Sequence, residues 1–120
     1  MFRILLIDDE PMIKIGVRKL LEDTDYIIAG TANNGMEALE YLKTNSVDII
    51  MTDLKMPVMN GLELIHRLNA LAFDGAILVL SNYSDFDLVR EALTEGALDY
   101  ILKTDMTRSR LLKYLEKISQ

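Results

Sequence analysis

Five short apolar runs alternate along the chain with segments whose apolar residues recur at helical spacing. The runs cover residues 2–7, 26–32, 47–52, 76–81 and 97–102, and each has the length of a β-strand. The first, third and fourth are almost continuous in Ile, Leu, Val and Met, which is typical of strands covered on both faces, as in a parallel sheet. The intervening segments, with Leu62, Ile65 and Leu68 as one example, predict crossover helices.

Residues at the segment ends support the same alternation. Asn34 and Asn60 can cap helices that begin at the next residue, and Ser84 with Asp87 predicts a capping box for the fourth helix. The last helix is expected over about residues 107–119. Five strand–helix pairs with right-handed crossovers predict an α/β fold, a doubly wound parallel sheet with helices on both faces.

Composition limits the classes of protein that fit. The 120 residues, half of them apolar, fit a single domain over residues 1–120, and the absence of cysteine removes thiol and disulfide chemistry. A formal net charge of -6 disfavours direct binding to nucleic acid or an acidic membrane. The short apolar N-terminal run resembles neither a signal peptide nor a membrane span, so we expect a cytoplasmic protein.

Unusual polar residues follow the predicted strands. Asp8 and Asp9 come after the first strand, Asp53 after the third, Ser81 ends the fourth and Lys103 follows the fifth. Because ligands of open α/β sheets bind outside the carboxyl ends of the strands, we expect these side chains to meet at one edge of the sheet.

Three carboxylates and one ammonium leave an excess of negative charge at that edge. Such a site raises the pKa of a carboxyl group or binds a cation. Oxygen ligands without His or Cys favour Mg2+, with Mn2+ as the alternative, and Mg2+ commonly completes its shell with phosphate. A flavin site is disfavoured because the acids after the first strand would repel a phosphate, and the chain has no P-loop, dinucleotide-binding glycine motif or Ser-His-Asp order.

Four motifs resemble the receiver domain of bacterial two-component response regulators. They are IDDEP (residues 7–11), MTDLKMPVMNG (51–61), LS (80–81) and DYILK (99–103), and the resemblance extends over the whole chain. It implies a flavodoxin-like (βα)5 fold with strand order 2-1-3-4-5. It also implies a signalling switch that catalyses only its own phosphorylation and dephosphorylation, not a metabolic enzyme.

The resemblance assigns roles to the residues at the sheet edge. Asp53 is the expected phosphoacceptor, and its phosphoryl group comes from a sensor histidine kinase or a small phosphodonor. Asp9 is the expected direct ligand of Mg2+, Asp8 supports it through metal-bound water, and the backbone carbonyl of Lys55 completes the protein ligands. Lys103 is expected to pair with the phosphoryl oxygens.

A second group of residues is implied to transmit or time the signal. Ser81 donates a hydrogen bond to the phosphoryl group, and Tyr100 follows it inward, which changes the surface formed by the fourth helix, fifth strand and fifth helix. Lys55 and Tyr83 flank the route of the hydrolytic water, and their bulk predicts slow autodephosphorylation. Glu10 is interpreted as an acid at the surface or one that affects the site only indirectly.

Two residues depart from the family pattern. Thr104 replaces the proline that usually follows the lysine, and because a non-proline cis bond costs about 2.5 to 4 kcal/mol, we expect a trans bond and a reshaped loop. Asn82 replaces a smaller residue, which predicts narrower access for phosphodonors.

The output of the switch is predicted from one further resemblance. SNYSDFDLVREA (residues 81–92) is similar to receivers joined to AraC-type DNA-binding domains. It implies a transcription regulator that forms a homodimer through the changed surface when phosphorylated and binds DNA through a C-terminal effector domain absent from this chain. A standalone phosphotransfer or interaction receiver and a phosphorylation-independent pseudo-receiver are the alternatives.

Overall fold

The parallel sheet predicted from the sequence is present in a computed structural model that describes residues 1–119. Gln120, the last residue of the expected domain, lies outside the described residues. The strands lie in the order β2-β1-β3-β4-β5 and every pair is parallel. Their bounds are Phe2–Ile7 (β1), Tyr26–Ala32 (β2), Ile49–Asp53 (β3), Ala76–Ser81 (β4) and Asp99–Leu102 (β5).

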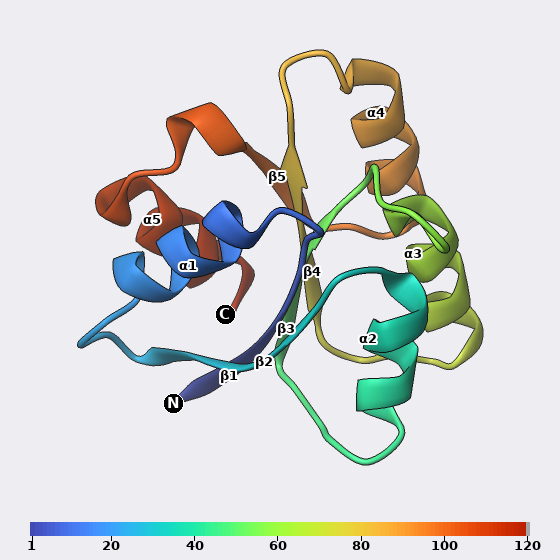
Figure 1. Ribbon diagram of the computed structural model, residues 1–120, viewed down its shortest axis with the longest axis horizontal. Helices are drawn as coiled ribbons and strands as arrows, with labels where there is room; N and C mark the ends of the chain where they lie inside the picture. Colours follow the sequence, from blue (N-terminus) through green and yellow to red (C-terminus); the bar gives the residue numbers. More distant parts are fainter. Residues whose placement is uncertain (120) are drawn as a thin grey trace.

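Helices cover both faces of this sheet. α1 and α5 lie on one face, and α2, α3 and α4 lie on the other (Figure 1). Their bounds are Pro11–Leu20 (α1), Gly35–Leu42 (α2), Gly61–Ala70 (α3), Phe86–Glu95 (α4) and Arg108–Ile118 (α5), with a 3-10 turn, η1, over Lys103–Asp105. The predicted fold class and strand order are therefore confirmed.

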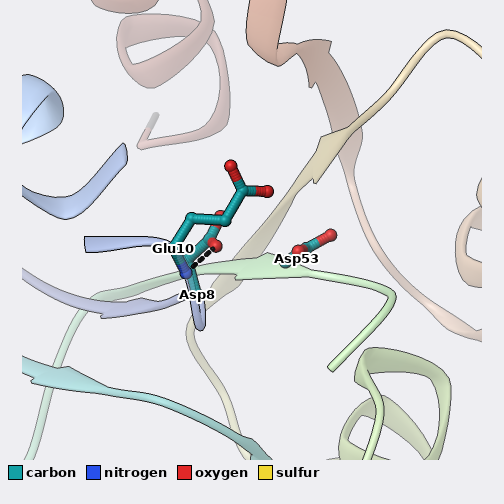
Figure 2. Close-up of side chains that lie close together, drawn as sticks. All are labelled: Asp8, Glu10 and Asp53. Carbon is teal, nitrogen blue, oxygen red and sulfur yellow. Dashed lines mark hydrogen bonds between the residues drawn. The ribbon is translucent and has the colours of Figure 1, made fainter. Parts of the chain in front are cut away.

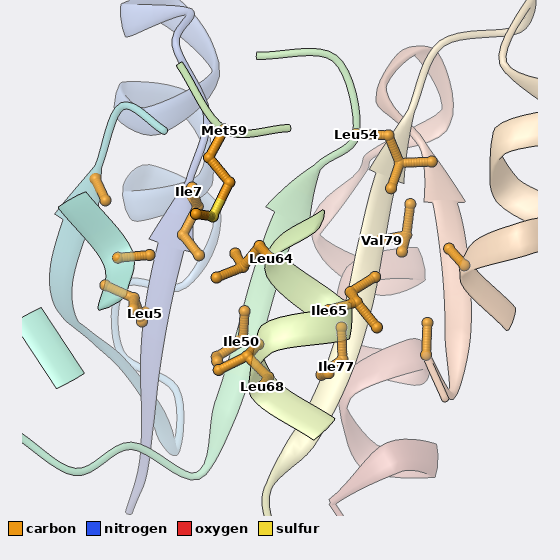
Figure 3. Packing of buried hydrophobic residues seen from close by; sticks show 14 of the residues in the cluster. Leu5, Ile7, Ile50, Leu54, Met59, Leu64, Ile65, Leu68, Ile77 and Val79 are labelled. Atoms are coloured by element: carbon orange, nitrogen blue, oxygen red, sulfur yellow. The ribbon is translucent and has the colours of Figure 1, made fainter. Parts of the chain in front are cut away.

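Successive residues of the inner strands face the two helical layers in turn. Leu5 and Ile7 of β1 pack in the cluster that contains α3 (Figure 3), whereas Ile4 and Leu6 pack with α1 and α5. All four side chains are fully buried. This two-sided burial explains why the inner strands read as continuous apolar runs and not as an alternating pattern.

Two of the predicted helix caps are correct and one is wrong. The side chains of Asn34 and Asn60 accept hydrogen bonds from backbone N–H groups in the first turns of α2 and α3. The capping box expected at Ser84 does not form, because α4 begins after Asp85 and the side chain of Asp85 accepts from the N–H of Asn82 instead.

Two strands begin later than predicted. β3 begins at Ile49 and not at residue 47, since its ladder with β1 begins where Ile49 pairs with Ile4. β5 begins at Asp99 and not at residue 97, because the N–H of Ala97 still closes the preceding helix by donating to the carbonyl of Ala92.

The strand order reverses between β1 and β3, so the loops that follow these strands diverge and leave a crevice at the carboxyl edge of the sheet. Asp8 follows β1 and Asp53 ends β3, which places both acids at this crevice. No helix in the described part of the chain is long and apolar enough to cross a membrane.

Candidate functional site

A single lysine lies within contact distance of three carboxylates at the carboxyl edge of the sheet. The Nζ of Lys103 is 2.8 Å from Asp8 Oδ2, 2.9 Å from Glu10 Oε1 and 3.0 Å from Asp53 Oδ2. The Lys103 side chain is 5% exposed, and the carboxylates of Asp8 and Asp53 are also buried, while that of Glu10 is half-exposed. One cation therefore faces three anions in a largely desolvated space.

The register of the sheet brings these residues together from distant parts of the sequence. Asp53 pairs with Leu80 in the ladder between β3 and β4, so Ser81 is the next residue along. Ser81 in turn pairs with Leu102 of β5, so Lys103 follows immediately at the same edge.

Local hydrogen bonds orient the acids. Asp8 Oδ1 accepts the backbone N–H of Glu10 at 2.8 Å, and this turn brings the carboxylate of Glu10 back beside that of Asp8 (Figure 2). Asp53 Oδ1 accepts the N–H groups of Leu54 at 2.7 Å and Lys55 at 3.3 Å. The backbone thus holds one oxygen of Asp53, and the other faces Lys103.

Burial and neighbouring charges have opposite effects on the pKa values of Asp8 and Lys103. Burial raises the pKa of the Asp8 carboxyl group above its ordinary value, and the contact with Lys103 opposes this effect without cancelling it. For Lys103, burial alone would lower the pKa of the ammonium group, but hydrogen bonds to Asp8, Glu10 and Asp53 outweigh it and the pKa is raised. Lys103 therefore stays charged while the cluster keeps an excess of negative charge.

The acidic cluster has the composition of a site for a hard divalent cation. Oxygen atoms of Asp8, Glu10 and Asp53 lie within 4.8 Å of one another, and no His or Cys side chain contributes. Such a donor set fits Mg2+ or Mn2+ better than zinc. Asp9, the ligand expected from the sequence, is exposed and lines a neighbouring cavity of about 420 Å³ together with Lys55.

The predicted switch residues line one cavity. Ser81 and Tyr100 both face a space of about 530 Å³ beside α4, which Tyr83 and Phe86 also line. The Ser81 side chain is fully buried, and its Oγ makes no hydrogen bond to any residue from 1 to 119. Tyr100 is 39% exposed and Tyr83 is 88% exposed. An unpartnered hydroxyl thus lies next to open space at the acceptor edge.

The loop after β5 contains Thr104 in place of the proline that is usual in the family. None of the described peptide bonds is cis, so the bond before Thr104 is trans as expected, and the chain enters the turn η1 directly at Lys103. With this trans bond, the ammonium group of Lys103 reaches Asp8 and Asp53.

Two contacts of charged side chains at the site have no counterpart in the sequence-based predictions. Asp85 is buried and lies 3.0 Å from the Nζ of Lys55, an ion pair that joins the loops after β3 and β4. Its sequence context, a serine before it and a phenylalanine after it, carries no signal of burial. The sequence predicts Glu10 to be an acid at the surface or one that affects the site only indirectly, whereas in the structure its carboxylate contacts Lys103 directly.

Comparison with known proteins gives consistent matches. The family described as the response regulator receiver domain matches residues 4–116. The chain is 41% identical over 115 residues to the nitrate/nitrite response regulator protein NarL of Escherichia coli K12, covering 95% of this chain and 53% of that protein. It is 33% identical to the chemotaxis protein CheY of Thermotoga maritima, covering 98% of both.

Solved structures match over the same extent. The signal receiver domain of a NarL response regulator from Mycobacterium tuberculosis superposes with a TM-score of 0.88 at 28% identity, covering 98% of this chain and 95% of that chain. The chain spans about half the length of several curated relatives that it matches, among them a transcriptional regulator of Pseudomonas aeruginosa at 54%.

Proposed function

Because the chain belongs to the response regulator receiver domain family of two-component systems, we propose that it is a signalling switch controlled by phosphorylation of Asp53. One observation carries the proposal: Asp53 is fixed by two backbone N–H groups on one oxygen and presents the other oxygen to Lys103 inside an acidic cluster. A carboxylate held in this way is positioned to act as a nucleophile.

The proposed reaction transfers a phosphoryl group to that carboxylate. An oxygen of Asp53 attacks phosphorus while the bond to the leaving group breaks, and the leaving imidazole of a kinase phosphohistidine, or acetate from acetyl phosphate, takes the bonding electron pair. The residues proposed to hold Mg2+ are Asp9, Asp8, Asp53 and the backbone carbonyl of Lys55. When bound, the cation supplies charge neutralisation between acid and phosphate. After the transfer, the ammonium group of Lys103 leaves the carboxylates and contacts the phosphoryl oxygens.

Ser81 and Tyr100 are proposed to convert the new charge into a change of shape. The unpartnered hydroxyl of Ser81 is available to donate to a phosphoryl oxygen, and such a bond to a charged group contributes about 1.5 to 3 kcal/mol, or about one to two decades in a two-state equilibrium. The cavity that it shares with Tyr100 offers space for the ring to move inward. The resulting change falls on α4, β5 and α5.

The surface on α4, β5 and α5 is proposed to be the output of the switch. It exposes large apolar side chains, including Phe86 and Leu93 of α4 and Tyr100 of β5, which favours a homodimer when the domain is phosphorylated. We further propose that residues 1–120 are the receiver domain of a longer cytoplasmic regulator of transcription, since the chain spans 53% of NarL. DNA binding would belong to an effector domain outside residues 1–120.

The lifetime of the phosphoryl group is proposed to depend on Lys55 and Tyr83. Both are bulky, and Lys55 flanks the acceptor through the contact of its N–H with Asp53. Slow autodephosphorylation is therefore expected, and a phosphoryl half-life under about a minute in Mg2+ would contradict this part of the proposal.

Beryllofluoride, a mimic of the phosphoryl group, tests the proposal without turnover. With Mg2+ present, we expect the mimic to bind, to shift the amide resonances of the loops after β3 and β4, and to increase the solution mass toward a dimer. Asp53→Asn should abolish all three effects. A response that persists in this variant would refute Asp53 as the acceptor.

A further inference from the structure

Asp85 is a buried acid outside the acidic cluster. Its side chain is 0% exposed, and it lies four residues after Ser81, immediately before α4. Asp85 Oδ2 accepts the N–H of Asn82 at 3.0 Å. Asp85 Oδ1 makes no hydrogen bond within residues 1–119 and lies 3.0 Å from the Nζ of Lys55. Because a buried carboxylate without a counter-charge is strongly disfavoured, this ion pair is the main compensation for its burial.

Lys55 belongs to the loop that carries the acceptor. Its N–H donates to Asp53 Oδ1 at 3.3 Å, and its side chain is 59% exposed. Among the described residues, Lys103 is the one lysine or arginine that forms a salt bridge with the acids around Asp53. The ammonium group of Lys55, two residues from Asp53 in sequence, is instead held at the start of α4.

We infer that Asp85 is a positioning residue for phosphoryl transfer, which acts by holding the ammonium group of Lys55 away from Asp53. This inference rests on the proposed function. The pair keeps a second positive charge from an acceptor site that is already too negative for an anionic phosphodonor. Asp85 thereby lowers the rate at which free phosphodonors reach Asp53, and it ties the loop after β4 to the loop after β3.

Removing Asp85 and removing Lys55 should have different effects on phosphorylation, although both changes break the ion pair. Asp85→Asn keeps the shape and the acceptor for Asn82, but it releases a charged lysine beside the site, so acetyl phosphate should react more readily. We expect the half-saturating concentration of acetyl phosphate to fall about fivefold, the factor that one unit charge near contact in water supplies. Lys55→Gln breaks the same pair without releasing a charge, so phosphorylation should be no faster than in the wild type.

The double variant distinguishes an effect of Asp85 that acts through Lys55 from a direct effect of the negative charge of Asp85 on the site. If Asp85 acts through Lys55, the double variant Asp85→Asn/Lys55→Gln should not show the lower half-saturating concentration of acetyl phosphate expected for Asp85→Asn alone. Asp87→Asn is the matched control, since it removes an exposed acid from the first turn of the same helix and Asp87 forms no salt bridge in the part of the chain that the structure describes. It should leave the half-saturating concentration within about twofold of the wild type, because screening weakens exposed charges.

The charge of the donor provides a second readout. A released ammonium group favours the dianion acetyl phosphate more than phosphoramidate, which carries less negative charge at neutral pH, so the gain of Asp85→Asn should be smaller with phosphoramidate. A merely structural role would slow both donors in both single variants.

The experiment measures phosphorylation rates against donor concentration for the wild type, Asp85→Asn, Lys55→Gln, the double variant and Asp87→Asn, with folding checked by circular dichroism. A gain in Asp85→Asn that disappears in the double variant supports the inference. An unchanged or slower Asp85→Asn, or a gain that survives in the double variant, would overturn it and leave phosphorylation of Asp53 standing. A wild-type chain that acquires no phosphoryl group would overturn both.

Discussion

Gly61 should tolerate no side chain, because a Cβ atom there would collide with the backbone that carries Asp53. The Cβ of an alanine would meet the backbone oxygen of Asp53 and would lie 2.9 Å from the Cα of Leu54. Gly61 also donates its N–H to the carbonyl of Leu54 at 3.0 Å, so the start of α3 packs directly against the end of β3. Gly61 has no positive φ, so the substitution Gly61→Ala tests the steric contact and not backbone strain.

The expected cost follows from these contacts. The neighbours are backbone atoms at the end of a fully buried strand and cannot move aside as a flexible side chain can. Overpacking of this kind typically costs about 1 to 3 kcal/mol. With a denaturant slope of about 1 to 3 kcal/mol per molar urea, the unfolding midpoint should fall by about 1 M. Displacement of Asp53 should also slow phosphorylation, by up to about a hundredfold if the carboxylate moves by about 1 Å.

Gly16→Ala is the matched control in urea unfolding followed by circular dichroism. Nothing lies within 4 Å of a Cβ atom at Gly16, in the interior of α1. This variant should gain about 0.5 to 1 kcal/mol, because alanine loses less backbone entropy in a helix than glycine does. A Gly61→Ala protein that is as stable as the wild type and is phosphorylated at the same rate would refute the steric argument.

Three further predictions concern the acidic cluster and one cap. Asp8→Asn should raise the free energy of unfolding at neutral pH without Mg2+, because burial raises the pKa of Asp8 in the folded protein. Protonation of Asp8 stabilises the wild-type fold fully below the ordinary pKa of 3.8, and this stabilisation is lost as the pH rises through the raised pKa. The gain in the variant should therefore appear only at the higher pH values, and an equal gain at all pH values would contradict the prediction. Lys103→Met leaves Asp8 and Asp53 buried without a counter-charge and should cost about 3 to 5 kcal/mol in urea unfolding, partly recovered by Mg2+; no loss in stability would count against the cluster. Asn60→Ala removes the acceptor for the N–H of Glu63 and should cost about 1 kcal/mol of thermal or urea stability, whereas no change would show that α3 does not depend on its cap.

The fold was predictable because burial on both sides of the sheet leaves a direct trace in the sequence. Ile4, Leu5, Leu6 and Ile7 face two helical layers in turn, and a continuous apolar run is the result. Asp8 and Asp53 were predictable for a related reason, since an acid at the end of a buried strand must lie at the edge of the sheet. The caps at Asn34 and Asn60 follow from side-chain chemistry alone.

Interactions between loops were not predictable in the same way. The burial of Asp85 depends on how the loop after β4 folds back to bond the N–H of Asn82 and on the reach of Lys55 from another loop. The contact between Glu10 and Lys103 depends on a turn in which Asp8 accepts the N–H of Glu10. Neither turn has a periodic pattern that marks it in the sequence.

Phosphorylation of Asp53 can be tested through the chemistry of its carboxylate. The wild type and Asp53→Asn are treated with acetyl phosphate and Mg2+, with a chelator as control, and intact mass is measured before and after treatment with hydroxylamine, which cleaves acyl phosphates. We predict a gain of one phosphoryl group in the wild type that requires Mg2+, is removed by hydroxylamine and is absent in Asp53→Asn. A wild type that gains no mass, or a gain that persists in Asp53→Asn, would contradict it.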